Sequence, residues 1–333
     1  VCDIYLVNEF GGIVGRPILT ACVDSYSSLC CGYALSWEGG MYSLRQLMLN
    51  VVTDKQELCK KHGINIKLQE WDSSLCPGVL VTDQGTEYVS NCFEQIAELG
   101  IKVVNLPVYR PELKGTVEKF FSIIQDLFRP YLKGRGLIEP DFQERGAHDY
   151  RKDACLTLEQ FEKVLLRCII YYNSQRVLEN FPYTDDMLKE KIPPYANDIF
   201  KYGMNLEGVN LVRVDKRQLM LTLLPRTEGK FTRSGLIVNR VRYKNTNYAE
   251  KYLSGGVVTV AYNPDDSSSV WLVEKGNFIE FTLIESRYQN KSFSEIEIMQ
   301  TAKKKIVKSV ETSNIQAKIN LASHIEAIVE NVG

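Results

Sequence analysis

Two carboxylates, Asp83 and Glu118, constrain the fold and the chemistry of this chain more than any other feature of its sequence. Asp83 follows a predicted strand, and Glu118 stands at the start of a predicted helix. Val79 to Thr82 is a short apolar, β-branched run between Pro77-Gly78 and Gln84-Gly85, and it predicts a buried strand that ends at Asp83. After 34 intervening residues, Glu118 stands at the start of a predicted helix whose apolar residues recur in steps of three and four. Strand ends are common ligand positions in α/β sheets, so we expect an α/β core that brings the two carboxylates together.

Such a pair suits metal-dependent chemistry on nucleic acid. Phosphodiester transfer needs charge neutralisation on the attacking and leaving oxygens, and two magnesium ions held by carboxylates can supply it. Lys114 and Gly115, one turn before Glu118, add a cation for a phosphate and a small residue that permits close approach. Each carboxylate also has an ordinary alternative, since Asp83 fits a turn and Glu118 fits an acidic residue that complements a helix dipole.

Five segments resemble one family of proteins. Asp83-Gln84-Gly85-Thr86-Glu87 and Lys114-Gly115-Thr116-Val117-Glu118-Lys119-Phe120 resemble the second and third acidic positions of DDE transposases and retroviral integrases. The opening segments, Asp3-Ile4-Tyr5-Leu6-Val7 and Ile13-Val14-Gly15-Arg16-Pro17, resemble the start of the TnsB-type transposases, within the group that includes Mu transposase. Leu223-Leu224-Pro225-Arg226 continues the resemblance.

The resemblance implies an α/β fold whose RNase H-like, integrase-type catalytic core has a mixed five-stranded sheet, followed by a small β-barrel and a C-terminal helical tail. We place the boundaries by changes in composition and periodicity: core 1–175 with an inserted loop at about 133–156, linker 176–204, DNA-contacting barrel 205–287, and basic helical tail 288–333. The tail could cross DNA or a neighbouring subunit, or it could be an ordinary solvated helix.

Periodicity predicts the individual elements. In the core it predicts strands at 2–7, 17–24, 28–36 and 101–106, and helices at about 42–61, near 90–99, from 117 to about Pro130, and from Leu158 to Tyr172. In the barrel it predicts strands at 219–223, 236–243, 257–262, 270–274 and 278–284.

The first metal-binding aspartate of the family belongs to an Asp-x-Thr segment a few residues before the position matched by Asp3. We therefore expect the chain to be a fragment that begins after this residue, with Asp3 as the available stand-in. A residue five positions away on a strand points to the opposite face, so Asp3 would need a different strand register. Asp24 lies between two strand-like runs and is predicted to be a hairpin-turn residue, not a metal ligand.

Charge is uneven along the chain. The formal net charge is −1, but residues 201–251 hold eleven basic and four acidic side chains. Nucleic-acid affinity depends on local cations that meet phosphates, so this excess favours DNA binding, although a solvated surface or a purely structural barrel could show the same pattern. The residues expected to contact DNA are Lys114, Lys119, Arg110, Arg226, Lys230, Arg233, Arg240 and Arg242.

Nine cysteines and three histidines could suggest a metal site, but no two cysteines have Cys-x-x-Cys spacing. We interpret the cysteines as reduced thiols of a cytoplasmic protein. No apolar run approaches the length of a membrane span.

The resemblance further implies cleavage at transposon 3′ ends and transfer of the 3′ hydroxyl into target DNA, with two Mg²⁺ ions that Mn²⁺ can replace. It implies a homo-multimer in a synaptic complex, an AAA+ regulator similar to TnsC, a separate endonuclease similar to TnsA, and a bacterial, nucleoid-associated location. The alternatives are a catalytically silent DNA-binding and assembly subunit, and another RNase H-like nuclease acting on RNA–DNA hybrids. The basic barrel and the Lys114-Gly115 helix start argue against the hybrid nuclease.

Overall fold

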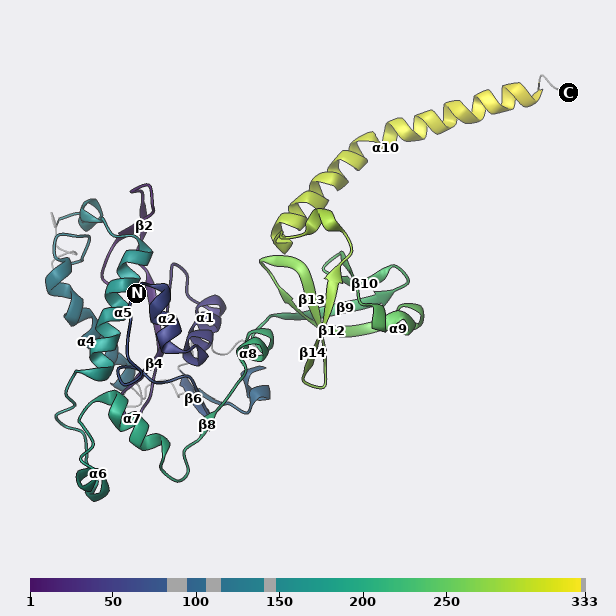
Figure 1. Cartoon of the computed structure of the whole chain (residues 1–333). Coiled ribbons are helices and arrows are strands. Elements are labelled where there is room, and N and C mark those ends of the chain that lie inside the picture. The colour runs from purple at the N-terminus through teal and green to yellow at the C-terminus, as the bar shows by residue number, and fades with distance from the viewer. Residues whose placement is uncertain (83–94, 106–114, 141–147, 331–333) are drawn as a thin grey trace. The chain divides into compact units, whose positions relative to one another are not determined.

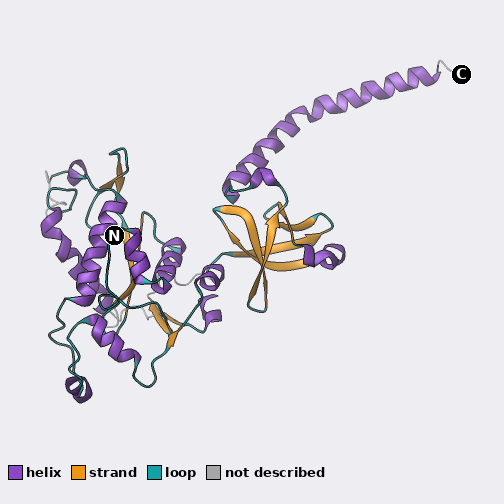
Figure 2. Ribbon diagram, in the orientation of Figure 1, coloured by secondary structure: helices purple, strands orange, loops and turns teal. Residues whose placement is uncertain are grey.

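The computed structural model describes residues 1–82, 95–105, 115–140 and 148–330 (Figure 1). The chain divides into two compact units, Val1–Leu223 and Leu224–Gly333. The first mixes helices and short strands, and the second is built around a barrel (Figure 2).

The strands of the first unit form pairs in the parts of the chain that the structure describes. Three pairs are antiparallel and one, β6 with β7, is parallel. The pairs are β1 (Leu6–Val7) with β2 (Ile13–Gly15), β3 (Ile18–Val23) with β4 (Cys30–Ser36), β5 (Cys76–Pro77) with β8 (Leu211–Val212), and β6 (Val79–Thr82) with β7 (Lys102–Asn105). The unit is thus mixed α/β as predicted, but the described ladders do not join into the expected five-stranded sheet.

The β3–β4 hairpin turns at Asp24. The Asp24 carboxylate accepts hydrogen bonds from the backbone N–H and the hydroxyl of Ser27, at 2.7 and 2.6 Å, and the Asp24 N–H donates to the carbonyl of Leu29. This side-chain-stabilised turn confirms the prediction of a turn residue at Asp24.

The segment predicted as one helix over 42–61 is two helices, α1 (Met41–Val52) and α2 (Lys55–Lys61). Asp54 caps α2 by accepting from the Glu57 N–H at 2.8 Å. The ammonium of Lys55, which is only 2% exposed, turns back and donates to the carbonyls of Asn50, Val51 and Thr53, at 2.6, 2.9 and 3.0 Å. The end of α1 is thereby satisfied by a side chain, which sequence periodicity does not reveal.

Two long helices form the centre of the first core. α4 (Gly115–Leu132) packs on α5 (Leu158–Ser174) through aromatic contacts: Phe120 meets Tyr172 edge-on with ring centroids 5.1 Å apart, and Phe128 meets Phe161 at 5.3 Å. The α5 prediction is confirmed. α4 ends at Leu132, two residues after Pro130, close to the predicted end.

Residues 133–156, predicted as an inserted loop, contribute in part to the core. Leu137 and Ile138 are buried, and the backbone around Gly136 hydrogen-bonds the first segment of the chain, with the Tyr5 N–H donating to the Gly136 carbonyl at 2.9 Å. A 3-10 helix at Tyr150–Asp153 follows. Another 3-10 helix among the described residues of this unit, Gln95–Leu99, falls within the helix predicted near 90–99, and residues 90–94 lie outside the described part of the chain.

The segment predicted as a linker, 176–204, differs in the structure. It contains α6 (Asp185–Lys189) and α7 (Ala196–Met204), and Ala196 and Phe200 belong to the first core. The predicted strand at 219–223 is also wrong, since this run lies largely within α8 (Lys216–Thr222). A short apolar run does not distinguish a strand from one buried helix face.

The second unit is a closed six-stranded barrel in the order β10-β11-β14-β13-β12-β9. The strands are β9 (Arg226–Thr232), β10 (Gly235–Val238), β11 (Val241–Lys244), β12 (Gly256–Asn263), β13 (Asp266–Glu274) and β14 (Asn277–Leu283). The expected barrel is confirmed, but its unit begins at Leu224 and not at 205. The periodicity did not predict β9, because this strand buries only Gly229 and Phe231 and its other residues are polar.

Three further helical segments accompany the barrel: a 3-10 helix at Thr246–Tyr248, α9 (Ala249–Ser254), and a 3-10 helix at Ser286–Tyr288. The tail is one long helix, α10 (Phe293–Glu330), as predicted. Its first turn is anchored on the barrel, because Ile296 is buried and Phe293 packs edge-on against Tyr262 at 5.2 Å.

Candidate functional site

Glu118 lies in the first turn of α4, with its side chain exposed. The helix buries the opposite stripe, Phe120, Ile124 and Phe128, against the core, so the packing with α5 fixes the face on which Glu118 stands. In the part of the chain that the structure describes, Glu118 has no ion-pair partner. An exposed, unpaired carboxylate on a rigid helix is a suitable oxygen ligand for a cation.

Asp83 follows the last residue of β6 and lies outside the described residues. Because β6 and β7 are parallel, with Thr82 opposite Asn105, the chain leaves both strands at the same edge of the pair. The prediction that Asp83 follows a strand is therefore confirmed, although this strand is not buried: Val79 and Val81 are 44% and 54% exposed.

Asp3 is held by two arginines. One carboxylate oxygen lies 2.7 Å from a guanidinium nitrogen of Arg16, and the other lies 3.8 Å from one of Arg129. Arg129 comes eleven residues after Glu118, about 16 Å along the α4 axis at 1.5 Å per residue. The structure thus brings Asp3 to the opposite end of α4 from Glu118, where it links the first segment of the chain to the helix.

The basic residues expected near the carboxylates are only partly described. Arg110 and Lys114 lie outside the described residues, whereas Lys119 is exposed on α4 and lines a cavity together with Arg176, which was not among the residues predicted to contact DNA. Local charge patterns do not reveal such a pair, because the two cations belong to segments more than fifty residues apart.

The barrel arginines and lysine do not form one cluster. Arg233 lies in the β9–β10 turn and Arg240 in the β10–β11 turn, and these turns are at opposite ends of β10. Arg226 begins β9 and is half-buried. Lys230 and Arg242 both stand opposite Ile237 of β10, one on each neighbouring strand.

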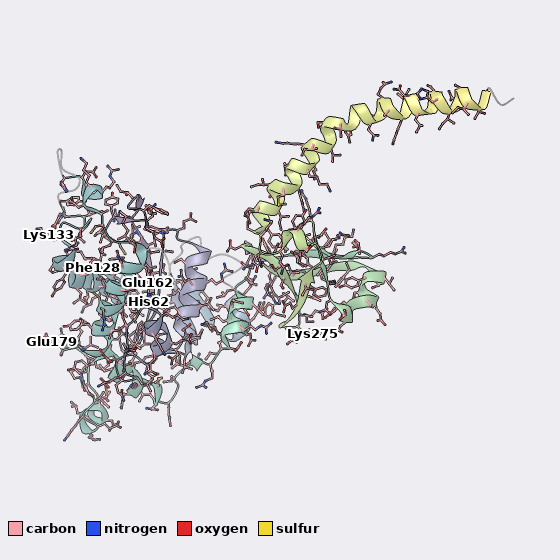
Figure 3. All side chains as sticks on the ribbon, turned by 45° about the horizontal axis from the view of Figure 1, so that its top comes forward. His62, Phe128, Lys133, Glu162, Glu179 and Lys275 are labelled. Atoms are coloured by element: carbon pink, nitrogen blue, oxygen red, sulfur yellow. The ribbon has the colours of Figure 1, made fainter. Side chains whose placement is uncertain are left out.

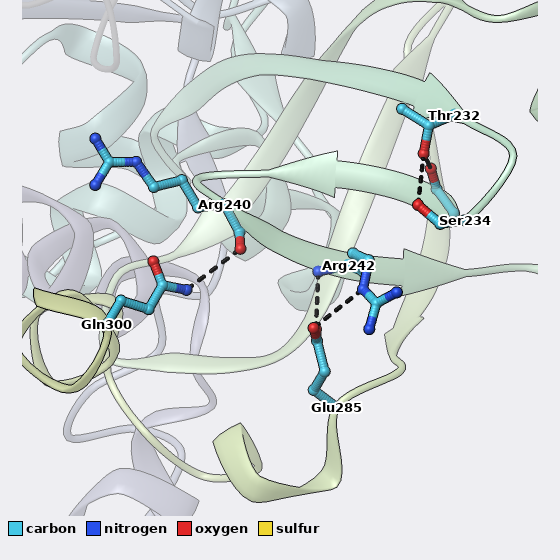
Figure 4. Close-up of polar contacts among 7 residues, drawn as sticks. Thr232, Ser234, Arg240, Arg242, Glu285 and Gln300 are labelled. Atoms are coloured by element: carbon cyan, nitrogen blue, oxygen red, sulfur yellow. Dashed lines mark hydrogen bonds and ion pairs between the residues drawn. The ribbon is translucent and has the colours of Figure 1, made fainter. Parts of the chain in front are cut away.

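The side chain of Arg242 is paired with a carboxylate of the barrel unit. Its Nε and its backbone N–H both donate to the Glu285 carboxylate, at 3.0 and 3.1 Å (Figure 4). Arg240 is exposed and its carbonyl accepts from the side-chain amide of Gln300 on α10. Lys230, Arg233 and Arg240 are the exposed members of this predicted set whose charged side chains have no carboxylate partner in the described part of the chain.

No group of three or more histidine, cysteine, aspartate and glutamate side chains that could hold a metal ion occurs among the described residues. Burial raises the pKa of the Cys2 and Cys59 thiols to about 11 and that of Cys76 to about 12. These thiols are therefore protonated near neutral pH. No described helix is long and apolar enough to cross a membrane.

Comparison with known proteins follows the same division of the chain. The model of the TnsB C-terminal domain matches residues 1–134, and that of the Mu transposase C-terminal domain matches residues 220–280. Transposon Tn7 transposition protein TnsB of Escherichia coli is 29% identical over 241 residues, which cover 71% of this chain and 34% of that protein. The transposase for transposon Tn552 of Staphylococcus aureus is 25% identical over 279 residues, which cover 83% of this chain and 50% of that protein.

This chain thus spans between a third and a half of the length of these relatives. Among solved structures, an intasome of simian T-cell lymphotropic virus in complex with a PP2A regulatory subunit shares 12% identity at a TM-score of 0.32, over 83% of this chain and 72% of that one. A TM-score this low does not establish a shared fold. The domain matches and the two relatives confirm the predicted resemblance.

Proposed function

We propose that this chain, which matches the TnsB C-terminal model over residues 1–134 and the Mu transposase C-terminal model over residues 220–280, acts in transposition through a DDE active site on an RNase H-like core. The reaction would be cleavage at transposon 3′ ends and transfer of the 3′ hydroxyl into target DNA. The observation that carries the proposal is the placement of Glu118, exposed and unpaired among the described residues at the start of a helix anchored in the core.

Asp83 and Glu118 would hold magnesium, or manganese in its place. These residues suit a magnesium site, because both are carboxylates, Glu118 is exposed, and Asp83 follows β6 at the edge where the parallel strands end. When bound, the metal supplies charge neutralisation at the attacking and leaving oxygens of the phosphodiester.

The remaining residues would position the DNA. Lys119, one residue after Glu118, is exposed and can hold a phosphate beside the carboxylate, and we assign Lys114 and Arg110 the same task. Because α4 is held by the Phe120–Tyr172 and Phe128–Phe161 contacts, the carboxylate and the cation keep a fixed spacing.

The barrel and α10 would hold DNA phosphates and organise the assembly. Lys230, Arg233 and Arg240 are the residues of the predicted barrel set best placed for this, because each is exposed and its charged side chain lacks a described acidic partner. The multimer on transposon ends, the TnsC-like AAA+ regulator and the TnsA-like endonuclease belong to the same proposal.

A catalytically silent DNA-binding and assembly subunit is the second candidate. The observation that favours it is the pairing of Asp3 with Arg16 and Arg129, because Asp3 is the available stand-in for the first metal-binding aspartate and it is held at the other end of α4 from Glu118.

The experiment is a strand-transfer assay on pre-cut transposon-end DNA with Mg²⁺ or Mn²⁺, using the intact gene product and its Glu118→Gln variant. Asp126→Asn is the matched control, since Asp126 is an exposed carboxylate on the same helix. We expect Glu118→Gln to lose strand transfer by at least about 100-fold while it keeps DNA binding. Wild-type-like transfer by Glu118→Gln would exclude Glu118 from the active site, and no transfer by any form despite DNA binding would favour the silent subunit.

A further inference from the structure

A cavity of about 710 Å³ opens in the first unit between three segments that are distant in the sequence. Its walls come from the β3–β4 turn with Tyr26 and Ser28, from Lys119 on α4, and from residues 176–182 after α5. Glu179, one of these wall residues, is labelled in Figure 3. This volume falls in the range of pockets that bind small organic ligands.

Two cations face this cavity without a described acidic partner. Lys119 is exposed, and Arg176 is half-buried with its guanidinium over the ring of Tyr172, 5.2 Å from the centroid. The stacking restricts the orientation of the guanidinium. Among the described residues of the lining, Glu179 is the one acidic side chain, so these residues carry two positive charges against one negative charge. Lysine and arginine placed together in this way bind phosphate.

Two aromatic side chains, Tyr26 and Phe181, form another part of the cavity wall. The rings of Tyr26 and Phe181 meet edge-on, with centroids 5.6 Å apart, and Phe181 also meets Tyr183 at 5.8 Å. The Tyr26 hydroxyl donates weakly to the sulfur of Met187, at 3.9 Å. These contacts hold the rings in place while Tyr26 stays 42% exposed. An exposed, immobilised ring is a platform on which a nucleobase can stack.

We propose that this cavity binds one nucleotide, with its phosphate at Lys119 and Arg176 and its base against Tyr26 and Phe181. The inference rests on the proposed function, because Lys119 follows Glu118 on α4 and the nucleotide would belong to a DNA strand that passes the catalytic carboxylate. Adjacent residues of a helix diverge by about 100°, so the nucleotide lies beside the phosphate that reacts and not on it.

The test is fluorescence anisotropy with a labelled single-stranded oligonucleotide and with an abasic strand of the same length and charge, both in EDTA. We expect the wild-type chain to bind the normal strand about 10-fold more tightly than the abasic one. Phe181→Leu and Tyr26→Leu should reduce this ratio to about one. Lys119→Gln and Arg176→Gln should weaken binding of both strands by a similar factor, because they remove phosphate contacts. Lys133→Gln, at a lysine 76% exposed just after α4, is the matched control.

Thymidine monophosphate, used as a competitor, separates the two sources of a nucleotide. Competition that is lost in Arg176→Gln would show that a free nucleotide suffices, and competition by the strand alone would identify the DNA chain; both outcomes support the cavity. Equal affinity of the wild-type chain for the two strands would overturn the proposal, as would an unchanged ratio in folded Phe181→Leu and Tyr26→Leu. The assay contains no metal, so an inactive Glu118 would leave its result unchanged.

Discussion

Replacement of Lys55 by methionine tests how much the buried Lys55 ammonium stabilises the C-terminal end of α1. The Lys55 ammonium donates to three carbonyls at the junction of α1 and α2 and lies 5.6 Å from the centroid of the Trp71 ring. Burial lowers its pKa from 10.5 to about 8. Methionine keeps the apolar stem and removes all three hydrogen bonds, so we expect Lys55→Met to lower the free energy of unfolding by about 3 kcal/mol at pH 7, roughly 1 kcal/mol per bond.

The pH dependence follows from the direction of this shift. The pKa is lower in the folded chain than in the unfolded one, so between pH 8 and pH 10.5 the unfolded chain binds more protons and stability rises with pH. From pH 7 to pH 9 this group adds about 1.3 kcal/mol, at 1.36 kcal/mol per pKa unit. Lys55→Met lacks that increment, so the difference in stability between the wild-type chain and the variant should grow by this amount.

The assay is urea unfolding at pH 7 and pH 9, followed by tryptophan fluorescence and far-ultraviolet circular dichroism, since Trp71 reports on the first unit. Comparison with the variant at each pH cancels the contributions of other titrating groups. A difference that is the same at both pH values would refute the reasoning, because Lys55 would then keep its ordinary pKa in the fold.

Three further predictions use single substitutions. Asp3→Asn should lower the free energy of unfolding by about 1 kcal/mol, because Asp3 pairs with Arg16 and Arg129. It should not change the affinity for Mn²⁺, and a loss of Mn²⁺ binding in calorimetry would instead show that Asp3 is a metal ligand. Lys230→Gln should weaken duplex binding and reduce its salt dependence more than Arg242→Gln, which is engaged with Glu285; the reverse order in salt titrations would contradict this assignment. Gly136→Ala should lower thermal stability by about 2 kcal/mol, because Gly136 has a φ of +87° and a Cβ there would lie 2.6 Å from the Tyr5 carbonyl oxygen; an unchanged melting temperature would refute it.

Local patterns predicted the elements whose signals are local. The stripe of Phe120, Ile124 and Phe128 predicted α4, and Asp24 between two apolar runs predicted the β3–β4 hairpin. β9 was not predicted, because polar residues dominate its sequence. α8 was predicted as a strand, because a short apolar run fits either a strand or one face of a helix. Prolines suggested a linker at 176–204, yet Phe200 is buried by contacts that only the tertiary fold supplies.

The site shows the same limit. Glu118 at a helix start and Asp83 after a strand could be predicted, since spacing and periodicity report on both. The pairing of Asp3 with Arg129 and the meeting of Tyr26, Lys119 and Arg176 could not, because each joins segments far apart in the sequence. Charge counts likewise do not show that Glu285 neutralises Arg242.

Mn²⁺ binding to the wild-type chain, Asp83→Asn, Glu118→Gln and the double variant, measured by calorimetry, tests most directly whether the two carboxylates form one metal site. The account predicts that each single variant loses at least about 10-fold in affinity and that the double variant loses little more than either single one, because ligands of one site are coupled. Wild-type affinity in either single variant, or independent losses that add in the double variant, would contradict it.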